Sequence, residues 1–157
     1  MSDNMFVNKI IFKVISVLLM SMTALALACG QGSEQQLLKM QQLWKSQNSS
    51  NYSYNVKKQY FCSPDYTREM RVLVADNAVA DAQYEDTNEQ VSKKIVKQLV
   101  TIPGWFIEIS KAIDNELGEV EVVYDKIQGY PENIKIDEHK RRSDDELTII
   151  ISEITKL

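Results

Sequence analysis

The side chains best suited to chemistry in this 157-residue chain include one cysteine in its interior and its sole histidine. Cys62 could act as a nucleophile with His139 as its base, or as a redox thiol. Nucleophilic catalysis needs a base within hydrogen-bond reach and a further group that orients the base. His139 lies in a segment crowded with charge, and apart from Lys58 nothing near Cys62 favours a thiolate. We therefore expect Cys62 to be a half-buried thiol at a strand end, with a catalytic pair or a mixed disulfide with a partner as alternatives.

An acidic segment, Asp137–Glu146, could in principle bind a hard cation. Calcium needs six to eight oxygen ligands and usually a tight loop that contains glycine. This segment has no glycine and carries Lys140, Arg141 and Arg142 at its middle. The candidate cation ligands are Asp137, Glu138, His139, Asp144, Asp145 and Glu146. We expect these residues to form a solvated charged loop instead of a cation site.

Tyrosines recur at positions where they could contact a ligand. Tyr52, Tyr54 and Tyr60 alternate along one predicted strand face, where they could stack on a ligand or form half of a core; we expect the core. Tyr130 lies in a Gly-Tyr-Pro turn, which we interpret as structural, with recognition as the alternative. The chain has no phosphate-binding loop, nucleophile elbow or histidine-rich metal motif. We assign no catalytic, cofactor-binding or metal-binding residue.

The N-terminus has the features of an export signal. Lys9 and Lys13 precede an uncharged run over residues 14–28, which is short for a bilayer span of about 20 residues. The run ends in Leu25-Ala26-Leu27-Ala28-Cys29, which resembles the lipobox of bacterial lipoproteins, although Ala26 stands where Leu is commonest in that family. The resemblance implies a diacylglyceryl group on the Cys29 thiol, cleavage before Cys29, and a second acyl group such as palmitate on the new amine. An ordinary cleaved signal and an uncleaved anchor are the alternatives.

The lipoprotein interpretation divides the chain into a signal peptide over 1–28, a lipidated cysteine with a short tether over 29–33, and a single domain over 34–157. Removing residues 1–28 changes the formal net charge from −4 to −5, because the segment carries two lysines and one aspartate. An acidic domain argues against non-specific nucleic-acid binding. Membrane attachment would therefore rest on the lipid, and two or three acyl chains make such attachment stable.

Hydrophobic periodicity predicts an α+β fold: a single antiparallel sheet of about six strands, with two or three helices packed on one face. Ser33 is the expected N-cap of the first helix, Thr101 caps a later one, and Asp76-Asn77 is a tight-turn signal. The last strand is apolar on nearly both faces, which predicts a central position in the sheet, with Ile154 opposite Ile151. Helices are expected near 34–47, 88–99 and 101–117, and strands near 52–62, 70–74, 79–84, 120–124, 134–136 and 147–154.

Several short motifs in order resemble an uncharacterised domain family of small bacterial lipoproteins and secreted proteins. They cover roughly residues 34–154, and the resemblance implies an exported α+β domain with no established activity. Members often carry Cys-x-Cys at the end of the first strand, where this chain has Tyr60 before Cys62, so a disulfide or paired-thiol metal site is not expected. The motifs are Asn51-Tyr52-Ser53-Tyr54, Tyr60-Phe61-Cys62-Ser63-Pro64, Arg71–Asn77, Thr101–Phe106, Val122–Asp125 with Gly129-Tyr130-Pro131, and Ile134–Asp137 before Asp144-Asp145-Glu146.

Two hypotheses of function follow. The leading one is a lipid-anchored, non-enzymatic module of the cell envelope that binds or holds an envelope protein or wall component. Gly30 after the cysteine resembles the sorting pattern for the outer membrane, facing the periplasm, if the source is Gram-negative. The alternative is an envelope hydrolase or a small-ligand-binding protein that uses Cys62 and His139 or the Asp137–Glu146 region.

Overall fold

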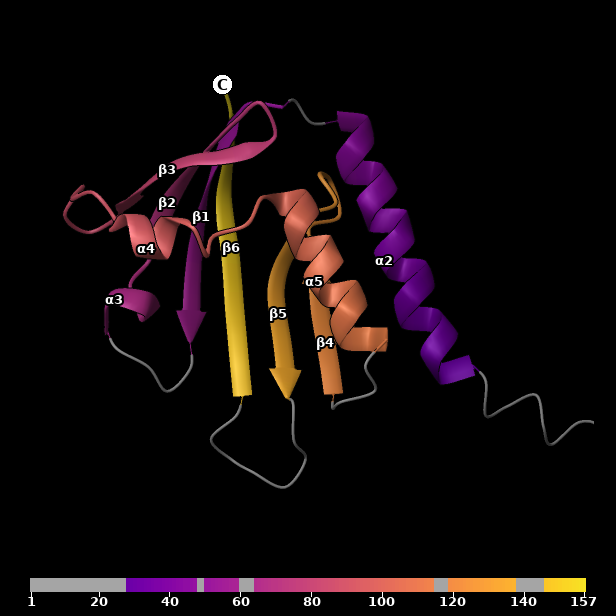
Figure 1. Ribbon diagram of the computed structural model, residues 1–157. Helices are drawn as coiled ribbons and strands as arrows, with labels where there is room; N and C mark the ends of the chain where they lie inside the picture. Colours follow the sequence, from indigo (N-terminus) through magenta and orange to yellow (C-terminus); the bar gives the residue numbers. More distant parts are fainter. Residues whose placement is uncertain (1–27, 48–49, 60–63, 115–118, 138–145) are drawn as a thin grey trace, which may run out of the picture. The chain divides into compact units, whose positions relative to one another are not determined.

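The computed structural model describes residues 28–47, 50–59, 64–114, 119–137 and 146–157 (Figure 1). The chain divides after Gln36 into two units. The described residues of the first unit, 28–36, are helical, and the second unit holds the rest of that helix and the whole sheet. In the described ranges, no helix combines the length and the hydrophobicity that a membrane crossing requires.

The second unit is built on one six-stranded sheet in the order β3-β2-β1-β6-β5-β4, with every pair antiparallel. The predicted α+β class is therefore confirmed, and so is the central position of the last strand. Helix α5 packs against β4 and β5, and α4 packs against β3 (Figure 1). The strands are β1 (Tyr52–Gln59), β2 (Met70–Ala75), β3 (Ala78–Tyr84), β4 (Glu119–Tyr124), β5 (Pro131–Asp137) and β6 (Glu146–Lys156); the helices are α2 (Ala28–Gln47), α3 (Pro64–Thr67), α4 (Lys93–Val96) and α5 (Ile102–Asp114).

The sheet consists of two three-stranded meanders that meet at β1 and β6. The β2–β3 turn is the predicted one: Asp76 and Asn77 have φ values of 51° and 62°, which a two-residue hairpin turn requires. Alternate residues of β2 are buried, as expected of a sheet covered by helices on one face, and the same alternation in β1 buries Tyr52, Tyr54 and Val56, with Asn55 buried in addition. The resulting core includes Tyr52, Tyr54, Val56, Val72, Val74, Ile134, Ile149 and Ile151.

Helix α2 begins earlier than the sequence predicted. It starts at Ala28, so the backbone of residues 29–33, expected to be a tether, is helical. Ser33 therefore lies inside the helix and is not its N-cap. Once a helix has nucleated, each further residue adds a hydrogen bond, so extension through Gly30 and Gly32 meets a penalty of only about 1 kcal/mol per glycine.

The helix expected over 88–99 is reduced to α4. The backbone groups of the residues before α4 form hydrogen bonds with β3. Tyr84 N–H donates to Glu89 O at 2.9 Å, and Val91 N–H donates to Ala82 O at 3.0 Å. Residues 89–91 therefore extend along β3 and cannot form the first helical turn. The apolar positions still face the core, because Val91, Ile95 and Leu99 are all buried.

Helix α5 begins as predicted, with Thr101 as its cap. Gly104 N–H donates to Thr101 Oγ1 at 3.2 Å, which satisfies one of the free donors of the first turn. Two buried tyrosines of β1 hold the same end: Ile102 N–H donates to Tyr52 Oη at 3.0 Å, and Tyr54 O–H donates to Val100 O. The expected end of this helix, at Leu117 and Gly118, lies outside the described residues.

The Gly-Tyr-Pro turn packs against α2. Gly129 has φ +84°, and a Cβ there would lie 2.6 Å from Met40 O. Tyr130 is buried and meets Trp44 edge-on at 6.4 Å between ring centroids, and Trp44 in turn meets Tyr52 at 5.3 Å. The structural interpretation of Tyr130 is therefore confirmed.

A bulge in β6 overturns the predicted side of Ile154. The pairing of β6 with β1 shifts by one residue between Ser53 and Asn55, and Glu153 has φ +53°. One extra residue inverts the alternation that follows. Ile154 therefore packs against the same core as Ile151.

Candidate functional site

Two of the three tyrosines proposed as a ligand-stacking face belong to the core. Tyr52 and Tyr54 are buried, which confirms the interpretation as core. Burial raises the pKa of Tyr52 to about 12, against a hydrogen bond from the Ile102 backbone that lowers it. Burial also raises the pKa of Tyr54. Tyr60 lies outside the described residues.

The cysteines, the histidine and most of the acidic segment are not placed in detail. Cys29 belongs to α2, but its side chain is not described, and Cys62, His139 and residues 138–145 lie outside the described ranges. Asp137 ends β5 and is partly buried, and Glu146 begins β6 opposite it. Among the described residues, no three His, Cys, Asp or Glu side chains are grouped as metal ligands would be.

The strands that flank Cys62 and His139 nevertheless end at the same end of the sheet. Gln59, the last residue of β1, pairs with Thr148 near the start of β6. Asp137, the last residue of β5, pairs with Glu146. The described strand ends next to residues 60–63 and 138–145 thus belong to three neighbouring strands.

A groove of about 570 Å³ opens at this end of the sheet. Its walls come from the end of β1, the residues around the start of β2, and the residues that follow β3. These three segments are neighbours because β1, β2 and β3 are adjacent and antiparallel. The lining residues are Lys57, Lys58, Gln59, Thr67, Arg68, Glu69, Glu85 and Asp86.

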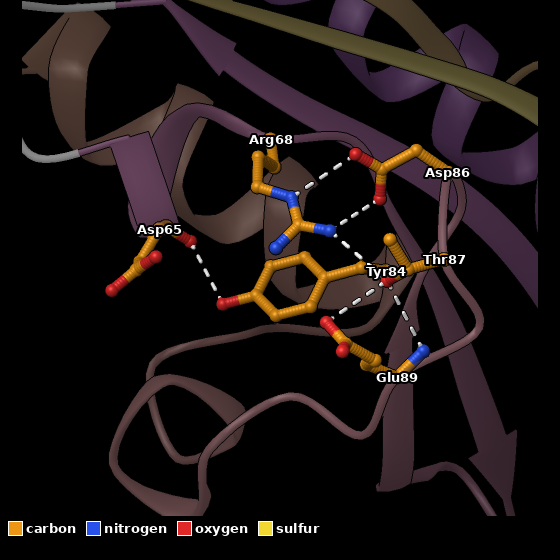
Figure 2. Close-up of polar contacts among 6 residues, drawn as sticks. All are labelled: Asp65, Arg68, Tyr84, Asp86, Thr87 and Glu89. Atoms are coloured by element: carbon orange, nitrogen blue, oxygen red, sulfur yellow. Dashed lines mark hydrogen bonds and ion pairs between the residues drawn. The ribbon is translucent and has the colours of Figure 1, made fainter.

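Arg68 ties one wall of the groove to the loop that follows β3 (Figure 2). Its Nε donates to Asp86 Oδ2 at 3.2 Å, and its Nη2 donates to Asp86 Oδ1 and to Thr87 Oγ1, the latter at 3.0 Å. Thr87 O–H donates to Glu89 Oε2 at 3.2 Å, and Glu89 N–H donates to Thr87 Oγ1 at 3.3 Å. The hydrogen bond with Asp86 raises the pKa of Arg68 and lowers the pKa of Asp86.

The Arg68 guanidinium also lies on the ring of Tyr84, 3.8 Å from its centroid (Figure 2). Such stacking adds a cation–π attraction to the ion pair and fixes the plane of the guanidinium. Tyr84 is buried, and its O–H donates to Asp65 O at 3.2 Å. Burial raises the pKa of Tyr84. Arg68 and Tyr84 together join α3, the start of β2 and the end of β3 into one rigid wall.

A second polar network supports the groove from the sheet face that the helices leave open. Asn55 is 2% exposed, and its Nδ2 donates to Glu69 Oε1 and to Glu153 Oε2, each at 3.2 Å. Arg71 forms an ion pair with Glu85. The other oxygen of that carboxylate, Glu85 Oε2, is buried and has no hydrogen-bond partner among the described residues.

Lys58 is the unusual cation of the groove. It lies on the helix-covered face of β1, half-buried, with its Nζ 5.6 Å from the centroid of the Trp105 ring. Burial lowers its pKa. Within the described part of the chain, neither Lys58 nor Lys57 forms an ion pair.

The open sheet face carries two smaller hollows and few apolar side chains. One hollow, of about 240 Å³, brings Leu73 and Leu157 together beside Arg71 and Asp81. The other, of about 390 Å³, lies over β4, β5 and β6 and is lined by Glu119, Glu121, Lys135, Ile136, Asp137, Leu147 and Thr148. This face is therefore mixed in character, with mostly polar groups around isolated aliphatic side chains.

Reasoning from the sequence did not find the groove. One signal was present in the sequence: Lys58 continues the inward alternation of Tyr52, Tyr54 and Val56, which places a cation on the buried face of β1. Arg68 and Asp86 gave no comparable signal, because their contact depends on the approach of two loops 18 residues apart.

Comparison with known proteins gives a family and no further relative. No curated protein and no solved structure matches the chain. A family model matches residues 36–156, which is most of the sequence and includes every described strand. The chain therefore belongs to the Family of unknown function (DUF6174).

Proposed function

We propose that this chain is a lipid-anchored protein of the bacterial cell envelope whose α+β domain binds a ligand or partner without catalysing a reaction. The anchor is supported by the sequence Leu25–Cys29, with its basic and apolar segments in the order of an export signal. Acylation at Cys29 would attach the domain to the membrane. Gly30 after the cysteine favours the outer membrane, facing the periplasm, in a Gram-negative cell.

The observation that carries the binding role is the groove at the end of the sheet. Its size falls within the range of about 300–1,000 Å³ that is usual for small-molecule sites. Its walls are held by Arg68–Asp86, Arg71–Glu85 and the Asn55 hydrogen bonds, so the lining groups are positioned before a ligand arrives. Preorganisation of this kind reduces the entropic penalty of binding.

The anchor is tested by the intact mass of the protein extracted from membranes. We expect a mature chain that begins at Cys29 and carries the mass of two or three acyl chains. Cys29→Ala should lose the added mass and the cleavage, whereas Cys62→Ala, the matched cysteine control, should keep both. An unmodified product from the unaltered chain would refute the anchor.

A second candidate function, an envelope enzyme that uses Cys62 and His139, is favoured by the strand ends that meet beside residues 60–63 and 138–145. This candidate predicts a Cys62 thiolate that a base stabilises, and hence fast alkylation by iodoacetamide near pH 6. The reaction should slow strongly in His139→Asn. Alkylation that follows an ordinary thiol pKa of about 8.5 in both proteins would exclude it.

A further inference from the structure

The two outer strands of the sheet differ in what lies beside them. Residues 89–91 run along the outer side of β3, where Gln83 pairs with Gln90. At the other end of the sheet, β4 is the last of the described strands (Figure 1). An edge strand presents a row of backbone N–H and C=O groups on its outer side. β4 is therefore the place at which another extended segment can lengthen the sheet.

The outer side of β4, with Glu119, Glu121 and Val123, is called the β4 edge below. Alternation puts these three side chains on the sheet face that the helices leave open, and all three are exposed. The Glu121 side chain is 63% exposed, and its carboxylate lies 3.9 Å from Lys135 Nζ. An ion pair of this length between exposed groups contributes little, so Glu121 can accept a second cation. The β4 edge therefore presents two carboxylates followed by one aliphatic side chain.

The opposite face of β4 is aliphatic. Val120 and Val122 are half-buried there and pack at the margin of the core on the side that α5 covers. Partly exposed aliphatic side chains at a sheet edge become more buried when a neighbouring strand brings a β-branched side chain beside them. A strand that matches β4 therefore has basic side chains on one face and β-branched side chains on the other.

The hollow of about 390 Å³ beside the β4 edge is acidic. Among the described residues that line it, Glu119, Glu121 and Asp137 carry negative charge, and Lys135 carries the one positive charge. Asp137 lies directly opposite Glu119 in the pairing of β4 with β5. A lysine or arginine side chain that reaches across from an added strand thus meets a surface of opposite charge, which is the usual basis of specificity between charged partners.

A second copy of this chain is disfavoured at the β4 edge. Antiparallel pairing of two β4 strands centred on residues 119–121 puts glutamates directly opposite each other, and like charges at such positions are destabilising. Charge on an edge strand is a common protection against self-pairing. The same charge favours a basic strand from another protein.

We propose that the β4 edge binds an extended, basic segment of a partner protein, which pairs antiparallel with β4 and adds a strand to the sheet. Its lysine or arginine side chains lie opposite Glu119 and Glu121, and an aliphatic side chain lies opposite Val123. In strand addition, backbone hydrogen bonds supply affinity and alternate side chains supply specificity. This surface is separate from the groove described above, and the proposal does not depend on acylation of Cys29.

The test is the fluorescence anisotropy of labelled peptides mixed with the full chain in a non-ionic detergent. The matching peptide is Thr-Val-Thr-Lys-Val-Lys-Thr, whose lysines lie opposite the two glutamates when its first valine lies opposite Val123. We expect saturable binding that weakens as the salt concentration rises from about 0.05 M to about 0.5 M.

Two control peptides separate strand pairing from charge attraction. Lys-Lys-Thr-Val-Thr-Val-Thr has the same composition, but its lysines point to opposite faces of a strand. The matching peptide methylated on every backbone nitrogen keeps both charges and cannot donate hydrogen bonds to β4. Each control should bind about tenfold more weakly than the matching peptide, because it lacks one of the two contributions.

Charge reversal in the protein gives the most specific result. In the double variant Glu119→Lys, Glu121→Lys, affinity for the matching peptide should fall about tenfold or more, since two attractive cross-strand pairs become repulsive. The peptide with glutamates in place of its lysines should bind this variant, which would also show that the variant is folded. Glu108→Lys, a charge reversal at an exposed position of α5, should bind the matching peptide normally.

Four results would overturn the proposal: no binding of the matching peptide, equal binding of either control peptide, an equal loss in Glu108→Lys, or no binding of the glutamate peptide to the double variant. Dimers of the unaltered chain that the matching peptide disrupts would identify a second copy as the occupant and contradict it as well. Failure at the β4 edge leaves the groove and the Cys29 anchor unaffected, because neither includes β4.

Discussion

Gly129→Ala should be the most destabilising single-methyl change in the described part of the chain. Gly129 has φ +84°, in the left-handed region that residues with a Cβ avoid. An added Cβ would lie 2.6 Å from Met40 O and 3.0 Å from both Leu43 Cβ and Trp44 N. The closest of these atoms belong to the backbone of α2, so no side-chain rotation can relieve the overlap.

The magnitude follows from two contributions. The left-handed backbone costs a residue with a Cβ about 1–2 kcal/mol. Relief of the overlap requires the 125–130 turn to move away from α2, and overpacking of this kind costs about 1–3 kcal/mol. The same movement loosens the edge-on contact between Trp44 and Tyr130. We therefore expect the free energy of unfolding to fall by about 2–5 kcal/mol.

Urea unfolding of the full chain in detergent, followed by tryptophan fluorescence, measures this change. Trp44 lies beside the turn, so the midpoint and the native emission should both shift. Ile127→Ala is the matched control, because it alters the same turn at a side chain that is 77% exposed, and it should change stability by less than about 0.5 kcal/mol. A loss below about 1 kcal/mol in Gly129→Ala would refute the reasoning.

Three further outcomes follow from the buried tyrosines and the Arg68 wall. Burial raises the pKa of Tyr52 and of Tyr124 to about 12, and it also raises the pKa of Tyr54. Above pH 10 the native state therefore keeps protons that the unfolded chain, with a tyrosine pKa of 10.0, has lost. Stability should therefore be level with respect to these groups below pH 10 and fall toward pH 12 by about 1.4 kcal/mol per pH unit for each tyrosine, and a flat urea midpoint over that window would contradict this. Tyr54→Phe leaves the Val100 carbonyl without its donor, so it should lower stability by about 1–3 kcal/mol and reduce the alkaline loss; an unchanged urea midpoint at neutral pH would count against the hydrogen bond. Arg68→Gln should speed amide hydrogen exchange in the loop after β3 while exchange in α5 stays unchanged, and equal exchange in that loop would mean that the ion pair does not hold the wall.

The two ion pairs beside the groove contribute to the domain mainly by positioning side chains. Ion pairs on a protein surface contribute little to stability, with a median of about 0–1 kcal/mol. Arg68–Asp86 and Arg71–Glu85 are partly exposed pairs, so their main effect is to orient the groove walls. Under the binding role that we propose, these positioned lining groups would contribute to ligand binding more than to the free energy of unfolding.

Much of the fold could be predicted from the sequence, because the relevant signals are local. The hairpin at Asp76-Asn77 and the Thr101 cap depend on residues within one turn of each other. The period-two pattern of β1 placed Tyr52 and Tyr54 in the core, since alternation alone decides which face a strand residue occupies. The central position of β6 followed from its apolar character on both faces.

The Cys29 pattern is likewise a property of the sequence. A lipobox is recognised as a linear segment, so its interpretation needs no fold and is tested by mass. The candidate pair Cys62 and His139 also came from the sequence, and its geometry stays a prediction.

Tertiary structure decided whatever depends on segments that are distant along the chain. The hydrophobic spacing around residues 89–91 predicts a helix, but their backbone groups form hydrogen bonds with β3 instead. Ile154 changes sides because the pairing of β6 with β1 inserts an extra residue at Glu153. The groove exists only because three strand ends meet, which brings together Lys58 near the end of β1, Arg68 just before β2 and Asp86 in the loop after β3. Hydrophobic spacing records which side of an element is buried, and only the folded chain determines which polar groups become neighbours.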